Sequence, residues 1–487
     1  MLSRIFRVHF VGIGGIGMSG IAEVLLVQGW PVSGSDLRSS SITERLQAMG
    51  ARIHIGHGAA NLGDAEVVVT STAVAADNPE VAAARALQIP VIPRAEMLAE
   101  LMRLKFGIAV AGMHGKTTTT SMIATVLAAV GLDPTVVVGG RLDAIGSNAR
   151  LGSSQYLVAE ADESDRSFLA LAPIMAVVTN LDREHLDCYR DLSDIQDAFV
   201  TFANRVPFYG TVVVGADDEA TRGILPRIRR RTLSYGLHED CDLRVVRAQL
   251  EGMEARFHLQ PTAGAAHLLG REHVASRDLG EFRLRRPGMH NVLDATAAIA
   301  VGLLLGRDLE VIRAAIENFG GVDRRFQLKG EIGGVRVIDD YGHHPTELAA
   351  TLAAAREVVH HPTQGHEAGR LLMIFQPHRY TRTFHLQHEF SQVLTLADQT
   401  WLLDIYPAGE APIAGVTSTA LAEQARAAGA HVSYAPSEEA AIAAIVQQAR
   451  PGDLILTQGA GSVSRLGPKL LEALHAAQAV PVRVERP

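Results

Sequence analysis

The segment that most constrains the fold of this chain runs from residue 106 to residue 131, FGIAVAGMHGKTTTTSMIATVLAAVG. Its apolar first part, Phe106–Ala111, predicts a buried strand, which a glycine loop and then a helix opening on four threonines follow. A loop of this kind directs backbone N–H groups toward a phosphate at a helix N-terminus, where the helix dipole favours negative charge. The segment therefore predicts a P-loop in a parallel α/β domain.

The residues of this loop match the needs of a nucleoside triphosphate. Lys116 is placed to reach the β- and γ-phosphates, and the hydroxyl of Thr117 to hold Mg²⁺. The loop is shorter than the general P-loop, because Val110 stands where that motif has its first glycine. An ordinary strand–turn–helix would explain the apolar pattern but not Gly-Lys-Thr at the turn. The ATP-binding residues predicted here are Gly112, Met113, His114, Gly115, Lys116, Thr117 and Thr118.

Lysine usage supports this interpretation. Lysine occurs only at positions 105, 116, 329 and 469, whereas arginine supplies the rest of the 45 basic residues. A chain that otherwise uses arginine thus keeps a compact ammonium group in the predicted P-loop, where a phosphate-binding point charge is needed.

Length and composition indicate a soluble protein of several domains. A chain of 487 residues is too long for one hydrophobic core, so we expect two to four domains. The net charge of −8 argues against nucleic-acid binding, and two cysteines suit a reducing compartment. No apolar run approaches the ~18 residues of a membrane span, and the N-terminal strand lacks a signal-peptide cleavage site. We expect a cytoplasmic monomer or weak dimer that binds neither nucleic acid nor membrane.

A second glycine loop lies near the N-terminus. The predicted strand Val8–Val11 leads into a GxGxxG pattern that starts at Gly12, and Asp36 ends the next strand. Read alone, this pattern predicts an NAD(P)-dependent oxidoreductase with Asp36 on a ribose. The same loop can hold any pyrophosphate at a helix N-terminus, and a P-loop would have no purpose in the oxidoreductase.

Acidic residues follow a further strand of the P-loop region. The predicted strand Tyr156–Ala159 ends in the acidic segment 160–165, EADESD. Carboxylates at a strand end beside a P-loop are what phosphate-bound Mg²⁺ requires. His185, after the next strand, is a candidate for a second metal ion. A zinc site with Cys188 is disfavoured, because no second pair of ligands follows.

The last third of the chain repeats the strand–loop–helix pattern of a doubly wound sheet, with one helix predicted over residues 385–394. Polar residues gather where three strands end, so that three loops at one sheet edge form a substrate crevice. Arg379 and Arg382, three positions apart, are placed to fork around one carboxylate, with solvent-exposed arginines as the alternative. The three strand-end segments are 339–344, 376–382 and 458–462.

Together these motifs resemble those of the Mur ligases, which build the cell-wall stem peptide. The likeness rests on the glycine loop, the P-loop, the acidic segment 160–165, DDYGHHP at 339–345 and PHRYTRT at 377–383. Met113 departs from the family, whose ATP loop usually has threonine there. The resemblance implies an α/β protein of three domains: a Rossmann-like domain at 1–105, a P-loop ATPase-like domain at 106–325 and a second Rossmann-like domain at 326–487.

Within the family the likeness is to the branch that adds L-alanine to UDP-N-acetylmuramate. It implies a reaction in which the lactyl carboxylate takes the γ-phosphate of ATP, and the alanine amine then attacks the acyl phosphate. Mg²⁺ is the implied cofactor beside ATP. Many relatives hold a second Mg²⁺ with a carbamylated lysine, but no lysine lies between Lys116 and Lys329. A recycling ligase that adds a tripeptide and a non-catalytic ATP-gated regulator remain alternatives.

The resemblance also implies roles for individual residues. Lys116, Arg325 and His343 are the implied catalytic residues, with Arg325 on the γ-phosphate and His343 orienting or deprotonating the amine. The glycine loop and Ser71 would hold the UDP-sugar, through Gly14, Gly15, Ile16, Gly17 and Met18. His290 and Asn291 would lie near the adenosine. The implied amino-acid site comprises Tyr341, His343, Arg379 and Arg382, and the implied metal ligands are Thr117, Glu160 and His185.

Overall fold

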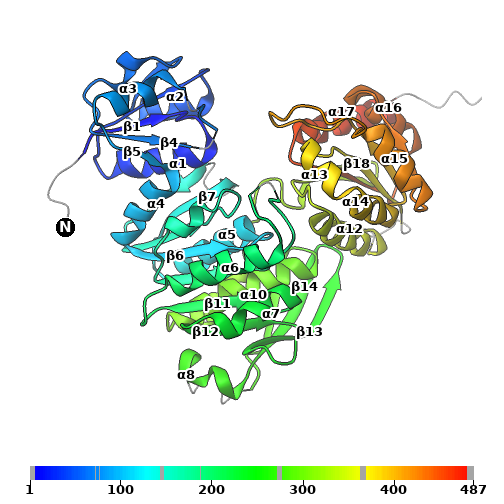
Figure 1. Ribbon diagram of the computed structural model, residues 1–487. Helices are drawn as coiled ribbons and strands as arrows, with labels where there is room; N and C mark the ends of the chain where they lie inside the picture. The colour runs from blue at the N-terminus through cyan, green and yellow to red at the C-terminus, as the bar shows by residue number, and fades with distance from the viewer. Residues whose placement is uncertain are drawn as a thin grey trace, which may run out of the picture. The chain divides into compact units, whose positions relative to one another are not determined.

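The computed structural model describes residues 6–71, 73–75, 77–142, 147–186, 188–270, 277–361 and 369–479 (Figure 1). The chain forms two compact units. Unit 1 comprises Met1–Arg247, Phe257–Arg283 and Leu293–Val322, and unit 2 comprises Ala248–Arg256, Leu284–Val292 and Asp323–Pro487. The strands of the three sheets lie within residues 8–93, 106–284 and 327–458. The boundaries expected at residues 105 and 325 fall between the sheets and stay predictions.

The first sheet has five parallel strands in the order β3-β2-β1-β4-β5. The strand order reverses at β1, so the glycine loop after β1 lies at a topological switch point, where open α/β sheets bind ligands. The strands are β1 Val8–Val11, β2 Val32–Asp36, β3 Arg52–Ile55, β4 Val67–Thr70 and β5 Val91–Pro93. The helices are α1 Ile16–Val27, α2 Ser41–Ala48, α3 Pro79–Ala86 and α4 Arg94–Arg103.

The second sheet has ten strands in the order β15-β14-β13-β12-β11-β10-β6-β9-β7-β8. Strand β6, which precedes the P-loop, pairs in parallel with both β9 and β10, so the segments after these three strands share one edge. The strands are β6 Phe106–Ala111, β7 Thr135–Leu142, β8 Ser147–Arg150, β9 Tyr156–Glu160, β10 Met175–Val178, β11 Thr211–Gly215, β12 Arg231–Gly236, β13 Leu243–Glu251, β14 Glu254–Pro261 and β15 Glu281–Leu284. The helices are α5 Lys116–Ala129, α6 Leu192–Asn204, α7 Glu219–Ile224, α8 Ala266–Leu269, α10 Met289–Leu304 and α11 Leu309–Glu317.

The third sheet, in unit 2, has the order β16-β17-β21-β18-β19-β20, with β16 antiparallel to β17. The strands are β16 Gln327–Ile332, β17 Val335–Asp340, β18 Leu371–Phe375, β19 Gln399–Leu402, β20 Val432–Tyr434 and β21 Leu454–Gln458. The helices are α12 Pro345–His360, α13 Tyr380–His385, α14 Gln387–Val393, α15 Ser418–Ala427, α16 Glu438–Gln448 and α17 Leu466–Ala479.

The core of unit 2 confirms a doubly wound sheet, because alternate residues of β18 pack into different clusters. Leu371 and Phe375 pack with buried residues of α12, α14 and α15, whereas Leu372 and Ile374 pack with those of α16 and α17. This alternation is what a strand covered by helices on both faces requires. The helix expected over 385–394 is interrupted at Leu386, whose φ of −119° and ψ of 23° separate α13 from α14.

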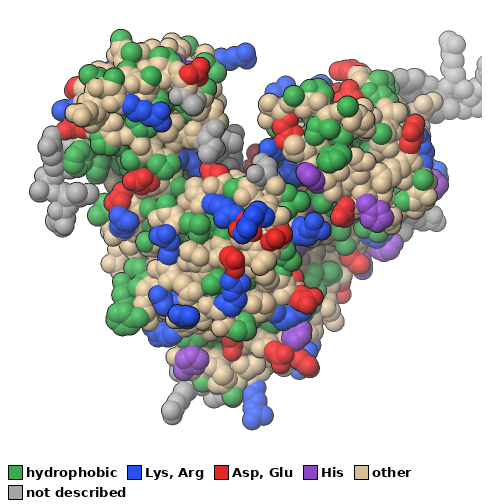
Figure 2. Space-filling model, in the orientation of Figure 1, with side chains coloured by type: hydrophobic (Ala, Val, Ile, Leu, Met, Phe, Trp, Pro, Cys, Tyr) green, Lys and Arg blue, Asp and Glu red, His purple; other side chains and the backbone are tan. Residues whose placement is uncertain are grey.

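Acidic and basic side chains are interspersed over the face of the molecule shown in Figure 2. Among the residues that the structure describes, no helix is both long enough and apolar enough to cross a membrane.

Candidate active site

The P-loop is held in shape by two residues that follow β10. The backbone N–H of His114 donates to Oδ1 of Asn180 at 2.9 Å, and Nδ2 of Asn180 donates to the His114 carbonyl at 3.0 Å. The Thr179 hydroxyl donates to the same carbonyl at 2.6 Å. Gly112 has a φ of +137°, and a Cβ there would lie 2.0 Å from Oγ1 of Thr179, so this position requires glycine. The sequence alone predicts no role for Thr179 or Asn180.

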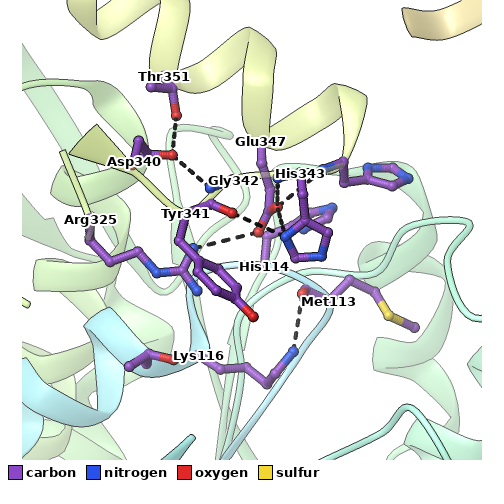
Figure 3. Close-up of polar contacts among 12 residues, drawn as sticks. Met113, His114, Lys116, Arg325, Asp340, Tyr341, Gly342, His343, Glu347 and Thr351 are labelled. Carbon is purple, nitrogen blue, oxygen red and sulfur yellow. Dashed lines mark hydrogen bonds and ion pairs between the residues drawn. The ribbon is translucent and has the colours of Figure 1, made fainter. Parts of the chain in front are cut away.

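Lys116, the first residue of α5, has its ammonium already fixed by oxygen atoms. Its Nζ donates to Oε1 of Glu163 at 2.8 Å and to the Gly112 carbonyl at 2.7 Å. It also donates to the Met113 carbonyl at 3.1 Å (Figure 3). Burial alone would lower the pKa of this ammonium, but the carboxylates of Glu163 and Glu160 raise that pKa above the ordinary lysine value. The group is therefore a positioned positive charge.

The three predicted metal ligands lie beside a fourth candidate, Glu163. Oγ1 of Thr117 donates to Oε2 of Glu160 at 3.0 Å, and Nε2 of His185 lies 3.3 Å from Oε1 of Glu163. The Glu163 side chain is 2% exposed, and its Oε2 has no hydrogen-bond partner among the described residues. Hydroxyl and carboxylate oxygens are the ligands that Mg²⁺ takes, so the side-chain oxygens of Thr117, Glu160 and Glu163 fit the ion. The ligand assignment itself stays a prediction.

The N-terminal glycine loop is held by Asp36. Oδ2 of Asp36 accepts a hydrogen bond from the Gly14 N–H at 2.9 Å, so this acid supports the loop. A Cβ at Gly17 would lie 2.7 Å from Nη1 of Arg94, and Nη2 of Arg94 pairs with Asp162 at 2.9 Å. Glycine at position 17 thus leaves room for an arginine that contacts the acidic segment after β9.

The other residues predicted to bind the UDP-sugar lie at the ends of β1 and β4. Gly15 is the N-cap of α1, Met18 is buried in its first turn, and Ser71 follows β4 with its side chain partly exposed. The side chain of Ile16 lies outside the described residues.

The three strand-end loops of unit 2 lie at one sheet edge, as predicted. Asp340 in β17 and Phe375 in β18 both pair with Gln458 in β21, between them. Nε2 of Gln458 donates to Oδ1 of Asp340 at 2.8 Å and to the Gly342 carbonyl at 2.7 Å. The Gln376 side chain accepts from the Val463 N–H at 3.2 Å. Glutamine side chains thus join neighbouring loops.

Tyr341, His343 and Arg325 gather around Glu347, in the first turn of α12 (Figure 3). The His343 N–H donates to Oε2 of Glu347 at 2.9 Å, and Nδ1 of His343 lies 3.1 Å from the Tyr341 carbonyl. Oε1 of Glu347 lies 3.7 Å from Nη1 of Arg325, whose guanidinium stands 5.0 Å from the centre of the Tyr341 ring. Glu347 was not predicted from the sequence, although its place in the first turn of the helix was a signal.

Arg379 and Arg382 stand at the start of α13 and contact other side chains. Nε of Arg379 donates to Oε1 of Glu410 at 2.6 Å, and Nη1 of Arg382 lies 3.4 Å from Nδ1 of His378. The His378 ring stacks on Tyr406 with ring centres 5.4 Å apart. Burial lowers the pKa of His378 to about 3, and the neighbouring histidine and arginines add to this effect. His378 is therefore neutral beside two cations.

His290 and Asn291 open α10. Nδ2 of Asn291 donates to the Pro287 carbonyl at 2.7 Å and lies 3.1 Å from Nε2 of His290. Gly288 has a φ of +92°, and a Cβ there would lie 2.6 Å from Cε1 of His290. Burial lowers the pKa of His290, and the charge of Arg325 lowers it further. The pair thus forms a neutral polar group at a helix start, and its contact with adenosine stays a prediction.

Comparison with known proteins identifies the family. Residues 7–106 match the family model described as "Mur ligase family, catalytic domain". Residues 110–302 match the "Mur ligase middle domain", and residues 324–461 match the "Mur ligase, glutamate ligase domain". The chain belongs to the Mur ligase family. The predicted family and its three-domain α/β architecture are therefore confirmed.

This Mur ligase is similar over its full length to curated proteins and to a solved structure. A protein of Koribacter versatilis is 57% identical, and the aligned region covers 98% of this chain and 99% of the relative. A protein of Geobacter sulfurreducens is 51% identical, with 98% of this chain and 100% of the relative covered. Both are named UDP-N-acetylmuramate–L-alanine ligase. The crystal structure of UDP-N-acetylmuramate-alanine ligase from Thermotoga maritima matches with a TM-score of 0.78 and 28% identity, covering 97% of this chain and 100% of that one.

Proposed function

We propose that this Mur ligase joins L-alanine to the lactyl carboxylate of UDP-N-acetylmuramate, converting ATP to ADP and orthophosphate. The observation that carries this proposal is the similarity, over almost the whole chain, to relatives that are named for this reaction and are 51% to 57% identical. Full-length similarity of this degree covers the third domain, where a recycling ligase for tripeptides would differ. The oxidoreductase alternative is disfavoured, because Asp36 holds the glycine loop and the chain has a P-loop.

In the first half of the reaction, a carboxylate oxygen attacks the γ-phosphorus of ATP, the bond to the β-phosphate oxygen breaks, and ADP leaves. Two anions must approach each other, so the chain has to supply positive charge. Lys116 supplies a fixed ammonium, and the P-loop N–H groups and Arg325 are the other proposed donors. When bound through Thr117, Glu160 and His185, Mg²⁺ would further neutralise the phosphates.

In the second half, the alanine amine attacks the acyl carbon, and orthophosphate leaves with the electron pair of the broken C–O bond. We assign Arg379 and Arg382 to the alanine carboxylate. Tyr341 and His343 orient the amine, and His343 or water takes its proton. Glu347 supports this role of His343. Its carboxylate accepts a hydrogen bond from the His343 backbone N–H, and Oε2 of Glu347 lies 3.7 Å from Nδ1 of His343.

The sugar nucleotide is assigned to the first domain. Its pyrophosphate would contact the N–H groups of the loop that Asp36 supports, at residues 14–18, with Ser71 nearby. His290 and Asn291 are assigned to the adenosine of ATP.

The test is orthophosphate release from ATP with UDP-N-acetylmuramate and Mg²⁺, with and without L-alanine, and mass spectrometry of the product. Release that requires both substrates, with one alanine added to the sugar nucleotide, supports the proposal. Activity with a tripeptide in place of alanine would reassign the protein to recycling. A folded, ATP-binding sample that is inactive with either donor would overturn the ligase assignment and favour the ATP-gated regulator.

A further inference from the structure

Glu410 makes three hydrogen bonds at the start of α13. Its Oε1 accepts from Nε of Arg379 and from Oγ1 of Thr381, both at 2.6 Å, and its Oε2 accepts from the Thr381 N–H at 3.0 Å. Burial raises the pKa of Glu410, but the hydrogen bonds from Thr381 and the charge of Arg379 hold that pKa below its ordinary value. The side chain is 15% exposed, so Glu410 is an ionised and mostly buried carboxylate.

The backbone that carries Arg379 is strained. Arg379 has a φ of +73°, in the region that favours glycine. Such a conformation costs about 1–3 kcal/mol and persists where surrounding contacts impose it. Here the Arg379 N–H donates to the Tyr406 carbonyl at 2.8 Å, and the Tyr406 N–H donates to the Pro377 carbonyl at 2.8 Å. Glu410, four residues after Tyr406, adds side-chain contacts to this backbone pairing.

These contacts fix both arginines assigned to the substrate. Arg379 is the N-cap of α13 and makes no side-chain cap, so the Thr381 N–H in the first turn bonds to Glu410 instead. Arg382 is carried by the same short helix. A guanidinium is planar, so the bond from Nε to Glu410 restricts the plane in which Arg379 presents its other N–H groups.

We propose that Glu410 is a positioning residue for the amino-acid substrate. It sets the guanidinium of Arg379 and the first turn of α13 in the arrangement that receives the substrate carboxylate. This inference rests on the proposed function, because it assumes that Arg379 and Arg382 bind the carboxylate of L-alanine.

The experiment compares Glu410→Gln with the wild-type full-length chain in the ligation assay. Glutamine keeps the size of the side chain but removes its charge, so we expect the KM for L-alanine to rise about 10-fold. The KM values for ATP and UDP-N-acetylmuramate should stay within about twofold. Glu423→Gln in α15 is the control, because Glu423 is exposed on the same unit and should leave all three values unchanged.

A double-mutant cycle distinguishes positioning from a general structural role. If Glu410 acts through Arg379 and the first turn of α13, adding Glu410→Gln to Arg379→Ala should raise the alanine KM by less than the factor that Glu410→Gln gives in the wild-type chain. The inference would be overturned if the effects of the two substitutions on the alanine KM multiplied in the double variant. A fall in kcat with an unchanged alanine KM in Glu410→Gln would also overturn it. If Glu410→Gln does not fold, Thr381→Val is tested in its place. It removes the hydrogen bond from the Thr381 hydroxyl to Oε1 of Glu410. A wild-type chain that does not ligate alanine refutes the proposed function, whereas an active wild type and a normal alanine KM in Glu410→Gln refute this inference alone.

Discussion

Nζ of Lys116 lies 2.8 Å from Oε1 of Glu163, a carboxylate that is 98% buried and also lies 3.3 Å from Nε2 of His185. One acidic side chain thus joins the proposed phosphate-binding lysine to a proposed metal ligand. A buried ion pair of this kind fixes geometry more than it adds stability.

We predict that Glu163→Gln lowers ATP-dependent turnover by about two orders of magnitude, since a small displacement of a positioning group has effects of this size. The measurement is orthophosphate release at saturating substrates, with UDP-sugar binding followed by calorimetry to confirm that the first domain is intact. Glu239→Gln, on an exposed turn of unit 1, is the control. Wild-type turnover in Glu163→Gln would show that the lysine needs no such anchor.

The contact between Asp36 and Gly14 leads to a second prediction. Asp36→Ala removes the acceptor of the Gly14 N–H, so the glycine loop loses one support and UDP-N-acetylmuramate should bind about 10-fold more weakly. ATP binding should be unaffected, since the P-loop lies on another sheet. Calorimetric titration of both nucleotides measures this, with exposed Asp77→Ala as the control. Equal loss of both affinities would indicate misfolding instead.

Asn180 offers a third test, because its side chain bonds to both the N–H and the carbonyl of His114. Asn180→Ala should raise the KM for ATP, by about 10-fold, and leave UDP-sugar binding intact. Asn318→Ala, at the exposed C-cap of α11, is the matched control. If the ATP KM does not change, the P-loop keeps its shape without this support.

The pattern of strands, loops and helices was enough to predict the architecture and the P-loop. β6 begins and ends where the apolar pattern predicts, because local periodicity and turn residues determine such boundaries. Parallel strands also bring their carboxyl ends to one edge, so the position of the three loops of unit 2 at one sheet edge was predictable from the strand–loop–helix pattern. The sequence likewise located Lys116 and the acidic segment 160–165.

What could not be predicted depends on tertiary contacts. Glu410 is 31 residues from Arg379, and Asn180 is 66 residues from His114, so no local spacing reveals either pair. Asp36 was placed correctly at the end of its strand, but its role depends on which partner its carboxylate reaches. Its local pattern is also that of a ribose-binding acid, and only the contact with Gly14 shows that it supports the loop.

The first domain contains a buried carboxylate, Glu80, that should make this domain sensitive to acid. The Glu80 side chain is 0% exposed. It accepts hydrogen bonds from Oγ of Ser35 and Nδ2 of Asn61, each at 2.5 Å, and from the Gly58 N–H at 3.1 Å, and it lies 3.3 Å from Nε2 of His9. Burial raises the pKa of Glu80, but these contacts more than offset burial and lower that pKa from 4.5 to about 2.

Because the folded-state pKa lies below the unfolded value, ionised Glu80 stabilises the domain above pH 4.5 by about 3 kcal/mol. This contribution falls as the pH drops from 4.5 toward 2, so about 1 kcal/mol should be lost by pH 3.5. We predict that the difference in unfolding free energy between wild type and Glu80→Gln shrinks by that amount between pH 7 and pH 3.5. Urea unfolding in a Trp401→Phe background isolates the fluorescence of Trp30, the other of the two tryptophans, which lies in this domain. Glu100→Gln, whose side chain is 45% exposed, is the control, and a pH-independent difference for Glu80→Gln would contradict the lowered pKa.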